Sequence, residues 1–467
     1  MSALPPIDDR DIRRATLVQL LHWLAIGRLQ PLELAASYQD AIKRLNPALN
    51  AYLETSDALI QEQAIAADRR RRDGVMGRLD GVPVAIKDNF DFAGLPTRAG
   101  MRRRSKPATH DAHVVARLRA SGAVILGKTN MDEGALGVTT DNPHHGVTHN
   151  PHRHGYTAGG SSGGAAVAVA AGLAAAAVGS DSLGSIRIPA SYCGIYAIKP
   201  THGEISARGL VPAARRLDAV GILARSVDDL TLLLQVLAGY DADDARSRRR
   251  RVAFQLPDWE PGHLRTGLLP DLAHFGIQPE VIDVFNQALE KLPRELGERR
   301  AVDFDDWDFA RTRRAGLLLM ESEMLNTFAE ELADEAYPVS ARLRGMLDYA
   351  RHKSAADYAA ADLVLDAATL KMRRLFAQVD VLVMPTTPQG AFPLSDTPPA
   401  SQADLTSFAS LAGCPAVSIP MGTLPNGLPI GMQLVGARGS DLRLLELAQV
   451  CASTLDADPI YPVEARA

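Results

Sequence analysis

The sequence predicts an α/β layered fold in which buried strands alternate with helices. Short apolar runs bounded by glycine, which are typical of buried strands, alternate along the chain with segments whose apolar residues recur at helical spacing. The 467 residues, 46% of them hydrophobic, also supply enough apolar material for a large core. We therefore expect a single domain that spans 1–467.

The helices are predicted from spacing and from the residues at their ends. Leu17, Leu20 and Leu24 recur at helical spacing, and Gly27 follows as a stop signal. A second helix is expected to open at Pro31, because proline is well suited to the first helical position. Further helices are expected at 112–119, 165–178, 281–292, 317–332 and 355–376.

The strands are predicted from short apolar runs that carry no helical period. These runs lie at 82–86, 123–126, 381–384, 416–419 and 432–435. The stretch at 245–380 is charged and mostly helical in pattern, so we expect a variable helical insertion that covers the sheet. Residues 381–455 are then expected to return to the core as its C-terminal part.

Charge and cysteine content narrow the functional classes. The 50 Lys and Arg residues nearly balance the 55 Asp and Glu residues, for a net charge of -5, so no global field for nucleic acid or lipid is expected. Basic runs at 69–72, 102–104 and 248–251 are interpreted as solvated surface. Three cysteines do not make a disulfide framework, which fits a reducing compartment and predicts a cytoplasmic location.

The sequence does not predict targeting or membrane insertion. The N-terminus lacks a basic segment followed by an apolar one, so we expect no signal peptide. The most apolar stretch, 163–179, is rich in alanine and shorter than the ~20 residues that a membrane span needs.

Three motifs suggest other functions. GAVILGKT at 122–129 matches the phosphate-binding loop pattern, but its middle residues belong in a strand rather than in a flexible loop. GGSSG at 159–163 matches a nucleophile elbow, which would make Ser161 the nucleophile with a later Asp and His. The histidines at 144, 145, 149, 152 and 154 crowd together, but no Cys or carboxylate stands at ligand spacing among them, so no metal site is predicted.

Three other segments place reactive residues in unusual settings. The segment GVPVAIKDN at 81–89 contains an apolar strand that ends at Lys87. YTAGGSSGG at 156–164 is a glycine and serine loop that contains Ser161, and GSDSLGSIRIPA at 179–190 contains Ser185. Taken singly, each has an ordinary interpretation as a surface lysine, a flexible loop or a capped turn.

In this order, the three segments resemble the amidase signature family. Four further stretches resemble that family too. They are GKTNMDE at 127–133, CGIYAIKPT at 193–201, Leu217 and Asp218 followed by ARS at 224–226, and GMQLV at 431–435. The resemblance is dense from about 30 to 235, recurs from about 380 to 450 and is thin between them. It implies a large mixed β-sheet core covered by helices on both faces and a catalytic core at 60–235. Substrate specificity is then expected to be set mainly at 245–400, where the resemblance is weakest.

The resemblance implies a Ser–Ser–Lys triad. Lys87 matches the catalytic lysine, Ser161 the bridging serine that follows an unusual cis peptide bond, and Ser185 the nucleophile. The backbone N–H groups of Ser182, Leu183, Gly184 and Ser185 are the expected oxyanion donors. The candidate substrate-binding residues are Met131, Gly159, Gly160 and Arg187. Arg187 and Asp181 lie beside the nucleophile, and Arg187 is favoured as a structural ion-pair residue over a ligand for a substrate carboxylate. His145 or His149 are candidates for the pocket lining.

The chemistry of such a triad sets a condition on Lys87. A serine hydroxyl is a weak nucleophile until a base takes its proton. The pKa of lysine is ordinarily near ~10.4, so a lysine base must be brought down toward ~7–8. Burial under Val82, Val84 and Ile86 would do so, because burial penalises the charged form.

The expected activity is hydrolysis of a carboxamide or urea-like C–N bond through an acyl-enzyme on Ser185. We expect a small-molecule amide substrate, no nucleic acid, no membrane and no cofactor, with a homodimer as the candidate assembly. The alternative is the glutaminase (A-type) subunit of a tRNA-dependent amidotransferase complex. That group usually has two glycines before the serine and glutamine where Ile188 stands, so Leu183 and Ile188 are departures. Leu183 is expected to border the acyl pocket and to influence substrate choice.

Overall fold

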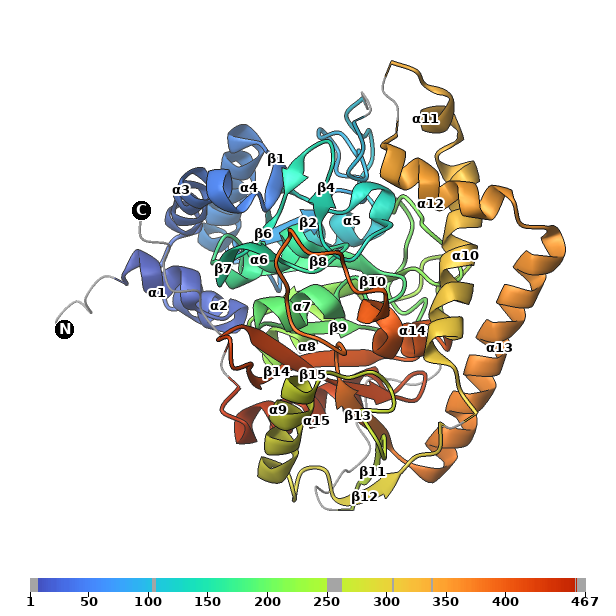
Figure 1. Cartoon of the computed structure of the whole chain (residues 1–467). Helices are drawn as coiled ribbons and strands as arrows, with labels where there is room; N and C mark the ends of the chain where they lie inside the picture. Colours follow the sequence, from blue (N-terminus) through green and yellow to red (C-terminus); the bar gives the residue numbers. More distant parts are fainter. Residues whose placement is uncertain are drawn as a thin grey trace.

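The computed structural model describes residues 7–102, 106–249, 263–304, 306–336, 339–457 and 459, and it confirms the α/β fold (Figure 1). The core is an 11-stranded sheet in the order β1-β3-β2-β8-β10-β9-β14-β15-β13-β11-β12. Its strands are β1 (Tyr52–Thr55), β2 (Pro83–Lys87), β3 (Val124–Thr129), β8 (Ala176–Asp181), β9 (Tyr196–Lys199), β10 (Ala219–Ala224), β11 (Arg265–Leu268), β12 (Glu298–Ala301), β13 (Val381–Pro385), β14 (Ala416–Thr423) and β15 (Pro429–Gly436). Two small hairpins are built from β4 (Asp141–Asn142), β5 (Gly146–Val147), β6 (His149–Asn150) and β7 (Arg153–Thr157).

The sheet is mixed. β2 pairs in parallel with β3 and β8, and β11 pairs in parallel with β12 and β13. The pairs that connect these two parallel groups through β10, β9, β14 and β15 are antiparallel. β2 is therefore an interior strand with all five residues buried, which places its C-terminal Lys87 deep in the molecule.

The helices of the first half are α1 (Asp9–Arg14), α2 (Leu17–Ala25), α3 (Pro31–Leu49), α4 (Asp57–Arg72), α5 (His113–Ala120), α6 (Gly163–Ala170), α7 (Arg187–Cys193) and α8 (Val227–Leu237). Those of the second half are α9 (Pro279–Lys291), α10 (Phe309–Thr327), α11 (Ala329–Ala333), α12 (Ala341–Arg351), α13 (Ala355–Gln378), α14 (Asp404–Leu411) and α15 (Asp441–Thr454). Short 3₁₀ turns occupy Glu133–Ala135 and Ala400–Ala403.

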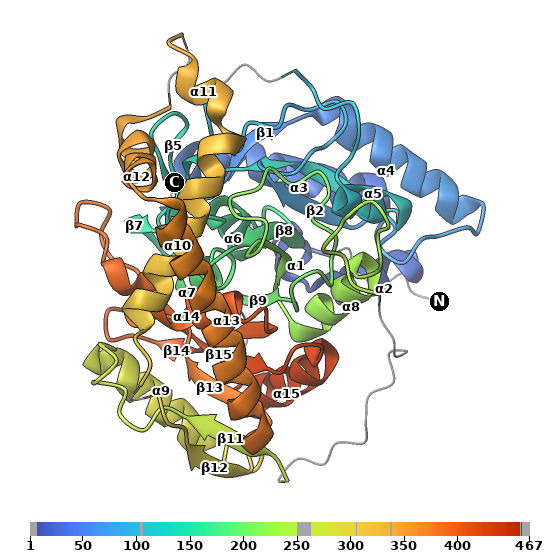
Figure 2. The same ribbon diagram turned by 90° about the vertical axis from the view of Figure 1, so that its right-hand side faces the viewer.

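The helices gather in layers around the sheet. α5, α8 and α15 form one contacting group, and α6 and α7 form another on β8, β9 and β14. α10 to α13 lie along one side of the molecule, away from α1 to α4 (Figure 1). In Figure 2, where that side faces the viewer, α10 and α13 run in front of the sheet. No described helix has the length and apolar character that crossing a membrane requires.

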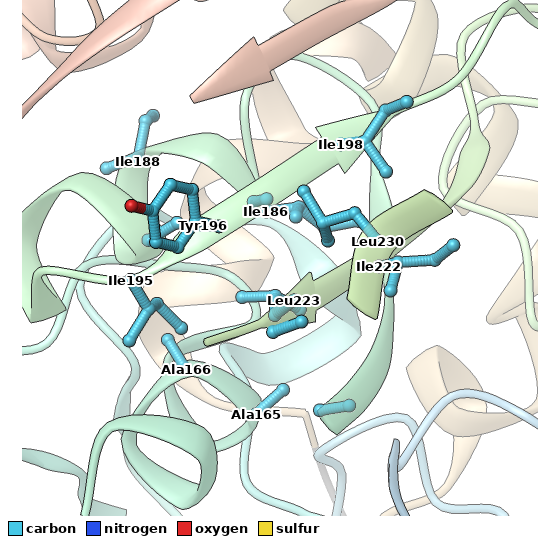
Figure 3. Close-up of a cluster of buried hydrophobic side chains, with 14 of the residues drawn as sticks. Ala165, Ala166, Ile186, Ile188, Ile195, Tyr196, Ile198, Ile222, Leu223 and Leu230 are labelled. Atoms are coloured by element: carbon cyan, nitrogen blue, oxygen red, sulfur yellow. The ribbon is translucent and has the colours of Figure 1, made fainter. Parts of the chain in front are cut away.

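A dense apolar cluster supports the segment around Ser185. Figure 3 shows side chains from α6, α7, α8, β9 and β10 in one cluster, including Ile186, Ile198 and Ile222. These three side chains are fully buried. Because Ile186 directly follows Ser185, its packing anchors the backbone of the expected nucleophile.

The structure corrects three of the expected elements. The helix expected at 165–178 ends at Ala170, and Ala176–Asp181 forms β8, because a run of buried alanines fits a strand as well as a helix. The helix expected at 317–332 is two helices, α10 and α11, which meet at Phe328. The stretch at 245–380 is not only a cover, because β11 and β12 extend the sheet. Of the basic runs, positions 103–104 and 250–251 lie outside the described residues.

Candidate active site

Lys87 ends β2 in a fully buried position. Burial lowers the pKa of Lys87 to about 7, although the carboxylates of Asp132, Asp218 and Asp181 oppose the shift. Lys87 forms no ion pair within the described part of the chain, and its Nζ donates instead to Ser161 Oγ at 2.8 Å and to Ser180 Oγ at 3.0 Å. The amine is thus directed at hydroxyl groups and is substantially neutral near pH 7.

Ser161 lies in the loop between β7 and α6, after a cis peptide bond between Gly160 and Ser161. The loop needs small residues. A Cβ added to Gly160 would lie 2.2 Å from Asp132 Oδ2, and one added to Gly159, whose φ is +78°, would lie 2.8 Å from Pro189 Cα. Gly159 and Gly160 therefore allow the close packing of this loop.

Ser185 lies between β8 and α7, next to the Ser161 loop. The backbone N–H of Ser162 donates to the Ser185 carbonyl oxygen at 3.1 Å, which holds the two serine segments together. Ser185 is 7% exposed, whereas Ser161 and Lys87 are fully buried. Of the three, Ser185 is the residue that a substrate can reach.

The turn before Ser185 is held by two buried carboxylates. Ser182 Oγ donates to Asp218 Oδ1 at 2.5 Å, and Asp218 Oδ2 accepts the N–H groups of Ala213 and Ala214. Burial raises the pKa of Asp218 to about 6, against the effect of these hydrogen bonds. The Gly184 N–H donates to Asp181 Oδ1 at 2.7 Å.

This last contact corrects one expected oxyanion donor. The Gly184 N–H is already used inside the turn, and the N–H groups of Ser182, Leu183 and Ser185 remain the candidates. Gly184 has a different role. Its φ is +136°, and an added Cβ would lie 2.2 Å from Thr406 Oγ1, so only glycine fits this position.

Arg187 is a structural residue, which corrects its place among the substrate-binding candidates. Its guanidinium is fully buried and binds both carboxylate oxygens of Asp181 at 3.0 Å. Its remaining N–H groups donate to Thr406 O, Gln433 Oε1 and Ser410 Oγ. Burial alone would raise the pKa of Asp181, but Arg187, helped by Lys199 and the Ile186 N–H, outweighs burial and lowers it. The ion pair favoured by the sequence is thus present.

We expect the replacement Arg187→Met to lower the free energy of unfolding by about 3–5 kcal/mol, because it leaves the buried Asp181 carboxylate without its partner. Urea unfolding followed by circular dichroism measures the change. Arg300→Met, at an exposed pair with Glu298, is the matched control and should unfold like the wild type. Equal stability of the two variants would mean that the buried pair contributes nothing to this turn.

Leu183 packs toward α10. A Cβ added to Gly316 would lie 2.7 Å from Leu183 Cδ2 and 3.2 Å from Leu411 Cδ1, so the missing side chain at Gly316 makes room for both leucines. The Leu183 carbonyl accepts the Thr406 hydroxyl at 2.6 Å. The departure at Leu183 is therefore accommodated by a glycine in a distant part of the chain.

The other candidates lie around this centre without forming one cluster. Met131 is buried, and its carbonyl accepts the Asn142 side chain at 2.8 Å. His145 Nε2 contacts Met101 O, and His149 stacks on His154, so neither is directed at Ser185. In the part of the chain that the structure describes, no group of three His, Cys, Asp or Glu residues could hold a metal ion.

The two remaining motifs also receive a structural explanation. The phosphate-loop pattern at 122–129 lies largely in β3, which is buried throughout, so its backbone is paired and does not form an anion-binding loop. In the elbow motif, Ser161 is fully buried against Lys87 and bonds no histidine among the described contacts.

Sequence reasoning missed the supporting roles of Ser180, Asp132 and Asp218. All three lie inside the segments that carried the resemblance. Ser180 is the second hydroxyl bound to Lys87 and also accepts the Asn89 amide at 3.0 Å. Asp132 Oδ2 accepts the N–H groups of Thr139 and Thr140. Their positions became evident only when separate strands and loops met.

Comparison with known proteins shows which family this chain resembles along its length. The family model Amidase matches residues 33–445. The A subunit of glutamyl-tRNA(Gln) amidotransferase from Archaeoglobus fulgidus is 35% identical over 429 residues, covering 86% of this chain and 91% of that protein. The corresponding subunit from Thermotoga maritima superposes with a TM-score of 0.78 at 30% identity, covering 95% of each chain. A 6-aminohexanoate cyclic dimer hydrolase complexed with substrate superposes with a TM-score of 0.86 at 26% identity, covering 97% of this chain and 99% of that one.

These relatives correct the expectation about partners. We expected a small-molecule amide alone, no nucleic acid and a homodimer as the candidate assembly, but the two amidotransferase relatives are subunits of an enzyme that is named for a tRNA. Net charge was a poor guide to binding partners because it averages over the whole surface. The family model covers most of the chain, and the family expected from the motifs is confirmed: this protein belongs to the amidase signature family.

Proposed function

We propose that this protein cleaves the C–N bond of a carboxamide through an acyl-enzyme on Ser185. The observation that carries the proposal is the Lys87 amine, which has a pKa of about 7 and lies 2.8 Å from Ser161 Oγ. A neutral amine is a base, and a serine hydroxyl can both donate and accept a proton. Lys87 and Ser161 can therefore relay a proton from the Ser185 hydroxyl.

In the proposed reaction, Ser185 Oγ attacks the carbonyl carbon while its proton moves to Ser161 and the Ser161 proton moves to Lys87. Backbone N–H groups of Ser182, Leu183 and Ser185 are the donors that stabilise the oxyanion, an effect worth about 3–4 kcal/mol per donor in other enzymes. The proton returns by the same relay to the leaving nitrogen, the C–N bond breaks, and ammonia or an amine departs. Water then attacks the ester by the reverse path and restores the Ser185 hydroxyl.

A second candidate function specifies both the amide substrate and the assembly in which the amide is cleaved. The amidotransferase relatives support glutamine as the amide and a tRNA-dependent amidotransferase complex as the assembly, with this chain as its glutaminase subunit. These relatives support a role as a subunit of such a complex more directly than they support a hydrolase that acts alone. Leu183 and Ile188, both buried beside the nucleophile, are the residues that depart from the usual glutaminase segment.

Two measurements test the proposal. Ammonia or amine release from glutamine, aliphatic, aromatic and cyclic amides is followed with the purified chain, and hydroxylamine is added to trap the acyl group as a hydroxamate. We expect release and hydroxamate from at least one amide, because an acyl-enzyme transfers its acyl group to a strong nucleophile. Release without any hydroxamate, or no turnover of any amide, would contradict the acyl-enzyme.

The glutaminase candidate is tested by adding glutamyl-tRNA(Gln) and co-expressed partner subunits. Stable copurification and a tRNA-dependent rise in glutamine turnover support it. Efficient turnover of other amides by the chain alone, with no response to tRNA, supports the free-standing hydrolase.

A further inference from the structure

A basic groove is lined in part by residues of α10 and α13. These two helices run in front of the sheet in Figure 2. The first part of the groove is a cavity of about 760 Å³ whose cationic lining is Arg215, Arg216, Arg246 and Arg438. Its second part, about 510 Å³, shares Thr369, Ala412 and Arg438 with the first and adds Arg248 and Arg373. The cations come from separate segments of the chain, so no local run of sequence reveals the groove.

The groove is distinct from the catalytic site. Leu411, which lines the first cavity, and Leu183, which belongs to the nucleophile turn, both reach toward Gly316. The triad residues Lys87, Ser161 and Ser185 do not line either cavity.

Carboxylates pair with some of the arginines that line the groove but not with the others. Arg215 pairs with Glu323 at 3.0 Å, and Arg216 pairs with Asp362 and Asp366. Among the described residues, no carboxylate lies within 4.0 Å of the guanidinium groups of Arg248, Arg373 or Arg438. The positive charge that remains is confined to these three arginines.

The three arginines lie close enough to influence one another. Burial, then the nearby Arg248 and, less strongly, Arg373 lower the pKa of Arg438, with Cys414 opposing. Arg248 Nη1 is buried without a hydrogen-bond partner among the described residues. Burying a guanidinium N–H without an acceptor costs free energy, and neighbouring like charges add to that cost. An anion between these groups would relieve both.

We propose that Arg248, Arg373 and Arg438 bind a small ligand that carries two or more phosphate groups. Arginine suits this chemistry because its planar N–H groups bind phosphate oxygens in pairs. The cavity volumes fall in the range of small-molecule sites. The acidic side chains Glu323, Asp362 and Asp366 favour a compact ligand over an RNA backbone, since a backbone needs a basic stripe that continues over the surface.

Calorimetry with inorganic triphosphate tests this site on the full chain. We expect Arg438→Gln to weaken triphosphate binding roughly tenfold, and Arg248→Gln with Arg373→Gln to weaken it further, because each exchange removes charge-assisted hydrogen bonds. Raising the salt concentration should weaken binding to the wild type. Amide turnover without triphosphate reports that each variant is folded, and it is independent of the binding result.

The matched control is the pair Arg69→Gln and Arg72→Gln on α4, which lie in the basic run at 69–72 and are exposed. This variant should bind triphosphate like the wild type. Equal loss in the groove and α4 variants, or no triphosphate binding by the wild type, overturns the proposal. Binding of tRNA that the groove variants lose, without triphosphate binding, overturns it in favour of an RNA surface.

Discussion

Replacing Ser185 by alanine is expected to abolish amide turnover. The nucleophilic oxygen is lost, and removal of a nucleophile in comparable serine hydrolases lowers kcat by roughly 10³- to 10⁶-fold. Stability should hardly change, because the Ser185 carbonyl that accepts the Ser162 N–H is retained and the side chain is small. Ammonia release measures turnover, urea unfolding measures stability, and mass spectrometry identifies the residue that carries any trapped acyl group.

Ser226→Ala is the matched serine control. Ser226 caps α8 by accepting the Asp229 N–H, so the variant should lose about 1 kcal/mol of stability and keep its turnover. Substantial turnover by Ser185→Ala, or an acyl group found on Ser161, would return the nucleophile to the glycine-rich loop.

Replacing Lys87 by methionine is expected to lower kcat/KM for amides by roughly 10²- to 10⁴-fold, the usual contribution of a general base. Esters should lose less, because an alkoxide leaves more readily than an amine and needs less help from the returned proton. Parallel assays on an amide and an ester with the same acyl group measure the difference. Equal losses on both would place Lys87 outside the proton relay.

The pKa of Lys87 also predicts the pH profile of the wild type. Its amine must be neutral to accept a proton, and its pKa is about 7, so kcat/KM should rise through pH 7 and then level off. Lys87→Met should lose this rise. A rise near pH 10 would mean that the amine keeps its ordinary pKa and that burial does not tune it.

The same burial makes Lys87 costly for folding. The unfolded chain binds the lysine proton below pH 10.5, whereas the folded chain binds it only near pH 7. Stability is therefore lost as pH falls from 10.5 toward 7, and Lys87→Met should be more stable than the wild type at pH 7. Lys199→Met, which removes another fully buried amine with a lowered pKa, is the control and should retain amide turnover.

Much of the core could be predicted from the sequence. The apolar runs that became β2, β3, β13, β14 and β15 lie where hydrophobic pattern placed them, because a strand buried on both faces needs a continuous apolar run. The alanine-rich run at 165–178 was ambiguous, because alanine fits helix and strand alike when every residue is buried. Only pairing with β2 and β10 decided that 176–181 is a strand.

In the candidate site, too, some features could be predicted from the sequence and others could not. The order of the three motifs was enough to select Lys87, Ser161 and Ser185, because each motif is local. The use of the Gly184 N–H by Asp181, the full engagement of Arg187 and the place of Leu183 beside Gly316 were not predictable. Each depends on contacts between segments that are brought together only by the fold.

By itself, the sequence determined the family, the α/β class and which side chains could carry the chemistry, because hydrophobic periodicity and short motifs are properties of neighbouring residues. Only the tertiary structure decided that the Lys87 amine is fully buried and which hydroxyl groups it contacts. It also decided that arginines from distant segments line one groove. Burial and electrostatic coupling depend on distances in space, and distances between remote segments are set by packing of the whole sheet and its helices.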